Sequence, residues 1–392
     1  MPVLSYTYES LQLLLEELGL ALSQAISRLL AWLMIAPDES GQALLEKTRA
    51  HLFRLAEKLP DDETTDMARR QRIRRFLSNS RIDVATFTPA LLRLLRPLLL
   101  GVDEVMLSMD RTEWHRRGQV VNVLSVAIVL DGITCPLYWI VLSRPGATGL
   151  QHWQQVLTPA IDALRCARWL EGCPLTVAAD REFASPKLAE WLFDTYRVNS
   201  VLRLKRSEYL LHGHDCQKVA DWLAPLRCGQ CRFLRDCRIT QSSDFCVNVA
   251  LLWEKGYDEP WVILSTHRTF PVTIEAYRKR WGIEPMHRHW KSSAFDIEGT
   301  RVTDPQRIAR LLIPIALCYA LCGLEGMREQ AAGEVRNAHK DKRTTSLFLR
   351  GLTRFTRLLR AFSVSRVRQF FEQLFKGYRW LDTLDEQLHQ RC

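Results

Sequence analysis

Residues 104–144 read EVMLSMDRTEWHRRGQVVNVLSVAIVLDGITCPLYWIVLSR, and this stretch decides the fold class. Three segments within it, at 104–110, 119–132 and 133–144, are rich in Val, Ile and Leu and are separated by polar turns. Such segments are typical of β-strands, because branched side chains fit a pleated, half-buried surface. Since the turns between them are short, we expect three neighbouring strands that form a meander.

The chain that follows alternates between helical and strand patterns. The helical patterns cover 149–170 and 185–196, and the strand patterns cover 175–180 and 199–206. Ser185 and Pro186 suit the N-cap and the first position of the second helix. The order of three strands, helix, strand, helix, strand predicts an α/β fold whose sheet has antiparallel and parallel parts.

The regions outside this alternation differ in composition. We expect a helical N-terminal region at 1–100, an α/β region at 101–206, a Cys-rich and mainly β insertion at 207–268, a return to helix at 269–327, and a basic helical C-terminal region at 328–392. The segment 61–83 has an acidic start followed by five arginines at 69–75, which suits a helix dipole; this predicted helix could present either a solvated face or a DNA-contacting one. The tail from 336 to 379 has twelve Lys or Arg against two acids.

The charge balance points to a polyanionic partner. The 392-residue chain has 54 Lys and Arg against 44 Asp and Glu, a formal charge of +10, which favours nucleic acid over membrane. The longest apolar run, at 311–324, is too short to span a bilayer and is typical of a buried helix. The N-terminus shows no signal-peptide pattern and the eleven cysteines are scattered, so we expect a cytoplasmic protein with reduced thiols.

Two aspartates lie at the ends of predicted strands. Asp110 ends EVMLSMD and Asp180 ends LTVAAD. An Asp in this place often caps the following turn, which is the structural alternative for either one alone. Two such carboxylates on neighbouring strands, with a third acid, would instead suit Mg²⁺ or Mn²⁺, which prefer hard oxygen ligands.

The segment YRKRWGIEPMHRHWK, residues 277–291, offers that third acid. At the helical period, Tyr277, Arg280, Glu284 and Lys291 fall within about 60° of arc, on one face. This face could be a plain stripe of helical ion pairs, or its acid could hold metal while its cations and phenol bind phosphates. Pro285 predicts a kink between Gly282 and Pro285, or an end near Trp281 followed by a new helix; across either break we expect Glu284 to face both aspartates.

The spacing of these four residues resembles the Y-R-E-K signature of bacterial DDE transposases of the insertion-sequence-4 family. LSMDRTEW, with Thr112 two residues after Asp110, and AADREF are similar to the first-Asp and second-Asp regions of that family. The resemblance covers about residues 103–325. It implies an RNase H-like catalytic core at 101–206 and 269–327, interrupted by the β insertion, and a DNA-binding role for 1–100.

The resemblance also implies roles for single residues. Asp110, Asp180 and Glu284 would bind Mg²⁺ or Mn²⁺, as two ions. Tyr277, Arg280 and Lys291 would contact DNA near the cleaved end. The activity would be cleavage at transposon ends and joining of those ends to target DNA. The partners would be terminal inverted repeats and target DNA, and a homodimer would pair the two ends.

Several weaker signals leave alternatives open. Trp253 and Trp261 could stack on a flipped base or fill the core of the insertion. Glu182, two residues after Asp180, could be an acid that contacts the metal ligands without binding the metal, or it could form a salt bridge; we favour the salt bridge. His287 could contact phosphate or metal, and Arg288 adds positive charge. A zinc site could form from four cysteines with the help of two histidines, although reduced thiols are favoured: Cys216, Cys228, Cys231, Cys237, His212 and His214.

Two other functions remain alternatives to the transposase. One is an RNase H-like nuclease or resolvase without strand transfer. The other is a non-catalytic DNA-binding protein derived from a transposase, against which the three intact acids argue.

Overall fold

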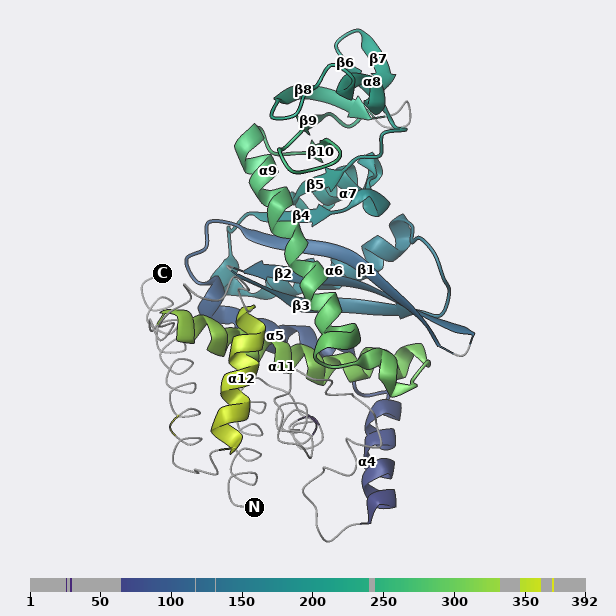
Figure 1. The fold of residues 1–392 in the computed structure, drawn as a ribbon, viewed down its shortest axis with the longest axis vertical. Helices are drawn as coiled ribbons and strands as arrows, with labels where there is room; N and C mark the ends of the chain where they lie inside the picture. Colours follow the sequence, from purple (N-terminus) through teal and green to yellow (C-terminus); the bar gives the residue numbers. More distant parts are fainter. Residues whose placement is uncertain are drawn as a thin grey trace.

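The computed structural model describes residues 65–116, 118–130, 132–239, 244–331 and 346–360, together with positions 26, 29 and 369. The helices expected at 1–64 and much of the basic region expected at 328–392 therefore lie outside the described residues. The described chain is a mixed sheet of ten strands with helices on both faces (Figure 1).

The meander expected from the opening sequence is present. Its strands are β1 (Val105–Arg116), β2 (Gln119–Leu130) and β3 (Ile133–Leu142), paired antiparallel in the order β3-β2-β1. The β1–β2 turn contains Gly118 and the β2–β3 turn contains Gly132, and both glycines have positive φ, which tight hairpin turns require. Since β2 lies between two partners and under helices, nearly all of its residues are buried.

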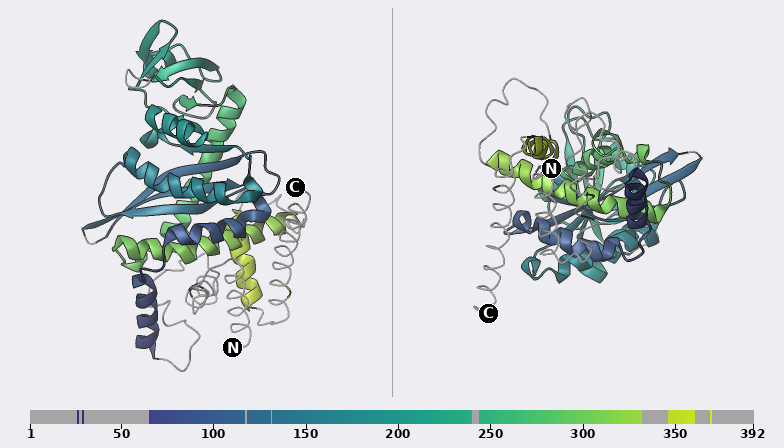
Figure 2. Two further views of the ribbon diagram at one scale, coloured as in Figure 1. Left: turned by 180° about the vertical axis from the view of Figure 1, so that it is seen from behind. Right: turned by 90° about the horizontal axis from the view of Figure 1, so that it is seen from below.

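Two helical crossovers add parallel strands to β1. The elements are α6 (Leu150–Cys166), η1 (Arg168–Leu170), β4 (Leu175–Ala179), η2 (Arg181–Phe183), α7 (Pro186–Tyr196) and β5 (Asn199–Arg203). Strand β4 pairs parallel with β1, and β5 pairs parallel with β4. Helices α6 and α7 cover one face of the sheet (Figure 2). The order β3-β2-β1-β4-β5, antiparallel and then parallel, is compatible with an RNase H-like fold.

The strands between 207 and 268 continue this same sheet. They are β6 (Tyr209–His212), β7 (Asp215–Lys218), β8 (Cys231–Ile239), β9 (Val247–Leu252) and β10 (Trp261–Ser265), with a short helix α8 (Val219–Leu223). Strand β10 pairs antiparallel with β5, so the sheet runs without interruption from the core into these strands.

The zinc alternative finds no support in this part of the chain. Cys216, Cys228 and Cys231 are exposed and Cys237 is buried, all as free thiols. Within the described ranges, no group of three or more His, Cys, Asp or Glu side chains is placed to hold a metal ion.

One helical stretch, residues 270–293, crosses the other face of the sheet, and we call it the Glu284 helix (Figure 1). It consists of α9 (Phe270–Lys279), the 3₁₀ turn η3 (Arg280–Gly282), α10 (Ile283–Arg288) and the π turn η4 (His289–Ser293). Its junction residues all keep right-handed helical angles. The break expected near Pro285 is therefore the 3₁₀ turn at Arg280–Gly282, which joins α9 to α10 without a sharp change of backbone angles. Pro285 lies in the first turn of α10, where the N–H that proline lacks would have no helical partner.

Gly282 allows this helix to lie close to the sheet. A Cβ atom at Gly282 would overlap the Thr134 hydroxyl oxygen of β3. A larger residue would therefore lift the helix off the strand or displace β3.

The remaining helices pack against the meander and each other. They are α4 (Asp66–Ser78), α5 (Val84–Leu99), η5 (Ile297–Thr300), α11 (Pro305–Ala331) and α12 (Leu347–Arg360). The apolar run at 311–324 lies inside α11, which is longer than that run and could cross a membrane by length and composition alone. In this structure, however, 83% of its most apolar window is buried, because α11 packs on β3, α5 and α12. Helix α4 buries only Ile73, Phe76 and Leu77, and a role of its arginines in DNA contact stays a prediction.

Candidate active site

Asp110 and Asp180 lie beside each other because β1 and β4 are parallel neighbours. Met109 pairs with Ala179, so the two aspartates are the next residues in the same register. Neighbouring strands are about 4.8 Å apart, and residues in one register point to the same face. The expectation that Asp110 ends its strand is wrong, since β1 continues to Arg116; the site is instead formed where the shorter β4 ends.

The Glu284 helix brings its own side chains to these aspartates. The Tyr277 hydroxyl donates to Asp180 Oδ1 at 3.3 Å. Arg280 donates through Nη2 to Glu284 Oε1 at 3.0 Å, and its guanidinium carbon lies 5.4 Å from the centre of the Tyr277 ring. The Ser108 hydroxyl donates to the Arg280 carbonyl at 3.2 Å, which ties the helix to β1.

The carboxylates act on one another electrostatically. The pKa of Asp110 is raised to about 6, mainly by burial and to a smaller extent by the charges of Asp180 and Glu284, while the hydrogen bond from the Arg111 N–H and the charge of Arg280 act in the opposite direction. The ionised form of Asp110 is therefore disfavoured in the folded protein, where two other acids lie near it. Such perturbed acids gather at functional sites more often than elsewhere.

Tyr277 and Arg280 are buried rather than exposed to a ligand. Tyr277 has no exposed surface and Arg280 is 2% exposed. Burial raises the pKa of Tyr277 to about 12, so its phenol is neutral and donates to Asp180. Burial disfavours the charge of Arg280, but Tyr277, Asp180 and Glu284 outweigh it and raise the Arg280 pKa. In this structure both side chains hold carboxylates, and the direct DNA contact expected of them is not available.

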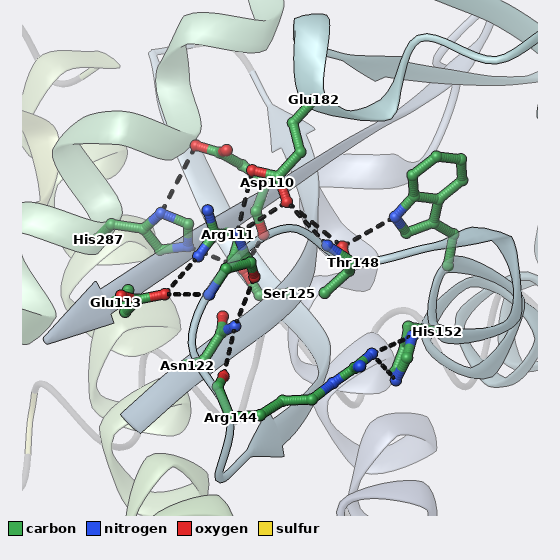
Figure 3. Close-up of polar contacts among 12 residues, drawn as sticks. Asp110, Arg111, Glu113, Asn122, Ser125, Arg144, Thr148, His152, Glu182 and His287 are labelled. Carbon is green, nitrogen blue, oxygen red and sulfur yellow. Dashed lines mark hydrogen bonds and ion pairs between the residues drawn. The ribbon is translucent and has the colours of Figure 1, made fainter. Parts of the chain in front are cut away.

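His287, on the Glu284 helix, approaches Asp110 (Figure 3). Its Nε2 lies 2.8 Å from the Ser125 hydroxyl oxygen, and its Nδ1 lies 3.7 Å from Asp110 Oδ2. Burial, with the nearby charge of Lys291, lowers the pKa of His287 to about 3, so the ring is neutral. The buried neutral imidazole is hydrogen-bonded to Ser125 and lies close to Asp110 without an ion pair; it does not reach outward to a phosphate.

Lys291, the last residue of the predicted face, is bound to residues other than the three acids, and the neighbouring Arg288 lies on the surface. Lys291 donates to the Glu113 carbonyl at 3.0 Å and pairs with Glu298 at 3.3 Å. It lies in the π turn, which changes the angular spacing assumed for a straight α-helix. Arg288 is exposed and is available to a ligand.

Glu182 is a salt-bridge partner, as favoured from the sequence. It accepts from Arg111 Nε at 2.8 and 3.0 Å and from the Thr148 N–H at 3.2 Å (Figure 3). Arg111 also donates to Glu113 Oε2 at 2.8 Å, and Glu113 accepts from the Gly146 N–H. These bonds attach the loop after β3 to β1 beside the candidate site.

The two tryptophans differ in environment. Trp261 is 2% exposed and packs edge-on against Tyr277 and Trp281. Its ring face is therefore closed to a base, and the stacking role expected for it does not agree with this structure. Trp253 is partly buried and donates through its indole N–H to the Tyr257 carbonyl at 3.1 Å.

Sequence reasoning missed Arg203 and Glu259. Arg203, the last residue of β5, lies 3.9 Å from Asp180 Oδ1 and 2.6 Å from Glu259 Oε1. The position of Arg203 at the end of a strand beside LTVAAD was the available signal. Nothing in the sequence indicates its pairing with Glu259, because the two are 56 residues apart.

The donor set of Asp110, Asp180 and Glu284 fits a divalent cation in chemistry. All three supply hard carboxylate oxygens, and a cation would offset the negative charge at Asp110, whose pKa is raised mainly by burial and also by Asp180 and Glu284. Glu284 is 52% exposed and paired with Arg280, so it would have to leave this partner to join the aspartates. Within the described residues no three His, Cys, Asp or Glu side chains are placed to hold a metal ion, so the expectation that Glu284 meets both aspartates is not fulfilled in this structure.

Comparisons with known proteins give a family for the chain. No curated protein matches the chain. The family model of the transposase DDE domain matches residues 99–321, which is more than half of the chain and contains Asp110, Asp180 and Glu284. The chain therefore belongs to the transposase DDE domain family.

Proposed function

We propose that this protein is a DDE transposase of the insertion-sequence-4 type. It would cut DNA at transposon ends by hydrolysis of a phosphodiester and join the freed 3′-hydroxyl to target DNA by transesterification. The observation that carries the proposal is the placement of Asp110 and Asp180 in one register, with Glu284 close enough for its charge to act on Asp110.

The chain supplies a site suited to this chemistry. Asp110, Asp180 and Glu284 would hold Mg²⁺ or Mn²⁺, which when bound activates the attacking oxygen and stabilises the leaving oxygen. Tyr277 orients Asp180 through its hydroxyl, and the neutral His287 ring lies beside Asp110. Arg280 keeps Glu284 beside the site and supplies a buried positive charge.

The substrate would be double-stranded DNA. The excess of cationic side chains over acids favours a polyanion, and exposed Arg288 and half-buried Lys291 flank the site. Pairing of two transposon ends would bring together two copies of the chain. The protein would act in the bacterial cytoplasm.

The test is an assay of cleavage and joining on linear DNA that carries the sequences flanking the gene. With Mg²⁺, the wild-type protein should release 3′-hydroxyl ends and insert them into a second DNA molecule. Asp110→Ala, Asp180→Ala and Glu284→Gln should each abolish both products while DNA binding persists.

The two alternative functions predict other results in the same assay. Cleavage of any duplex without joined products would show a nuclease or resolvase. Tight binding of the flanking sequences without cleavage by the wild-type protein would show a non-catalytic DNA-binding protein.

A further inference from the structure

Three arginines surround one carboxylate beside the candidate site. Glu259 Oε1 lies 2.6 Å from Arg181 Nη2 and 2.6 Å from Arg203 Nη2. Glu259 Oε2 lies 3.8 Å from Arg206 Nη2. We call Arg181, Arg203 and Arg206 the arginine cluster.

The arginine cluster adjoins Asp180 directly. Arg181 follows Asp180 in the chain and opens η2. Arg203 reaches both acids, since its Nη1 lies 3.9 Å from Asp180 and its Nη2 binds Glu259. A group held by this cluster would therefore lie next to the carboxylate that the proposed reaction uses.

The position of Glu259 suits a displaceable occupant. It lies between β9 and β10, in a segment that crosses from one strand to the next, and its side chain is 36% exposed. The same segment is held independently at its start, where Glu254 pairs with Arg278 at 2.5 Å. Release of Glu259 would thus leave the segment attached to the Glu284 helix.

The arginine cluster carries more positive charge than is required to neutralise Glu259. Three guanidinium groups face Glu259, and among the described contacts only Arg203 has a second acid, Asp180, within reach; the pairs made by the more exposed Arg181 and Arg206 each contribute only about 0–1 kcal/mol to stability. Two oxygens of a phosphate can accept two N–H bonds from one guanidinium, as the two oxygens of a carboxylate do. Anchoring a loop would require one such pair, whereas a phosphodiester uses several donors.

We propose that the arginine cluster is a phosphate-binding site for the DNA strand that enters the candidate active site, and that Glu259 occupies it in the DNA-free protein. This inference rests on the proposed function for the identity of its ligand. Glu259 then competes with DNA, so the protein binds DNA less tightly than its arginines would allow.

The test compares two variants that change net charge equally. Glu259→Gln removes the competing carboxylate, whereas Asp258→Asn removes the exposed neighbouring charge, for which the described contacts include no arginine partner. Binding of the full-length protein to a short DNA duplex of arbitrary sequence is measured by fluorescence anisotropy in EDTA. We expect Glu259→Gln to bind about tenfold more tightly than Asp258→Asn, the ratio given by about 1.4 kcal/mol.

A second pair of variants tests the arginines independently of Glu259. Arg206→Gln should weaken binding and lower the slope of log affinity against log salt by about one, as expected for the loss of one phosphate contact. Arg197→Gln, an exposed arginine at the far end of α7, is its control and should change neither quantity. In the Arg206→Gln background, Glu259→Gln should gain less affinity than in the wild type, because the two residues act on one site.

Equal affinity of Glu259→Gln and Asp258→Asn would overturn the proposal, and so would weaker binding by Glu259→Gln than by the wild type. If Glu259→Gln does not fold, an Arg206→Gln variant that binds as well as Arg197→Gln would overturn it. Because binding is measured without divalent metal, the result does not depend on cleavage. A failure to cleave, with the tenfold difference present, would count against the proposed function alone.

Discussion

Replacement of Asp110 by Asn should stabilise the metal-free protein. The Asp110 pKa is raised from its ordinary value of 3.8 to about 6, mainly by burial. At about 1.36 kcal/mol per pKa unit, the ionised carboxylate costs the folded state about 3 kcal/mol, and water penetration reduces this to about 1–3 kcal/mol. The asparagine side chain carries no charge, so the Asp110→Asn variant should gain that amount while it loses activity.

The gain should depend on pH in a defined direction. The folded protein binds a proton at Asp110 more readily than the unfolded chain does, so wild-type stability at this group falls as pH rises from about 4 to about 6. The advantage of Asp110→Asn should therefore be largest at about pH 8 and vanish near about pH 4. Denaturant unfolding in EDTA across this range measures both quantities.

Asp180→Asn is the matched control. The Asp180 carboxylate is already compensated, because it accepts from Tyr277 and lies near Arg203. Asp180→Asn should give no comparable stabilisation. An Asp110→Asn variant that is no more stable than the wild type at high pH, or a gain that does not change with pH, would refute this reasoning.

Two further substitutions test the position of the Glu284 helix and the packing of α12. Arg280→Lys should lower the cleavage rate by about tenfold or more, because Lys cannot reproduce the flat guanidinium between Tyr277 and Glu284. The DNA affinity of Arg280→Lys should stay within about threefold of the wild type, and a large loss of affinity in a binding assay would show that Arg280 contacts DNA directly. Gly351→Ala should destabilise the protein by about 1–3 kcal/mol in denaturant unfolding, because the added Cβ would overlap the Cys322 carbonyl of α11. Unchanged stability of Gly351→Ala would mean that α12 does not pack this closely.

The meander and the crossover strands could be predicted because their residues follow local rules. Val, Ile and Leu mark the strands, and the glycines mark the turns. The true length of β1 was harder to see, since it continues through polar residues that alternate with buried Thr112 and Trp114. The pairing of β10 with β5 could not be predicted, because a long-range pairing leaves no local pattern.

The residues of the candidate site could be predicted from the sequence, but most of their contacts could not. Helical spacing placed Tyr277, Arg280 and Glu284 on one face, and they do contact one another or the aspartates. Spacing alone does not say which face meets the sheet, so the burial of Tyr277 and Arg280 was not foreseen. Pro285 suggested a break, but a proline in the first turn of α10 is compatible with a continuing helix.

If Asp110 and Asp180 hold a divalent metal, as we propose, cysteine in their place should change the metal that the enzyme uses. Cysteine thiolate binds Mg²⁺ poorly and accepts softer metals such as Mn²⁺ more readily. Cleavage by Asp110→Cys and Asp180→Cys should therefore be absent with Mg²⁺ and partly restored with Mn²⁺, whereas the matching Ala variants stay inactive with both. Glu182→Cys, a nearby acid that pairs with Arg111, should show no such switch. Full cleavage by Asp180→Cys with Mg²⁺, or equal cleavage by the Cys and Ala variants with Mn²⁺, would contradict the claim.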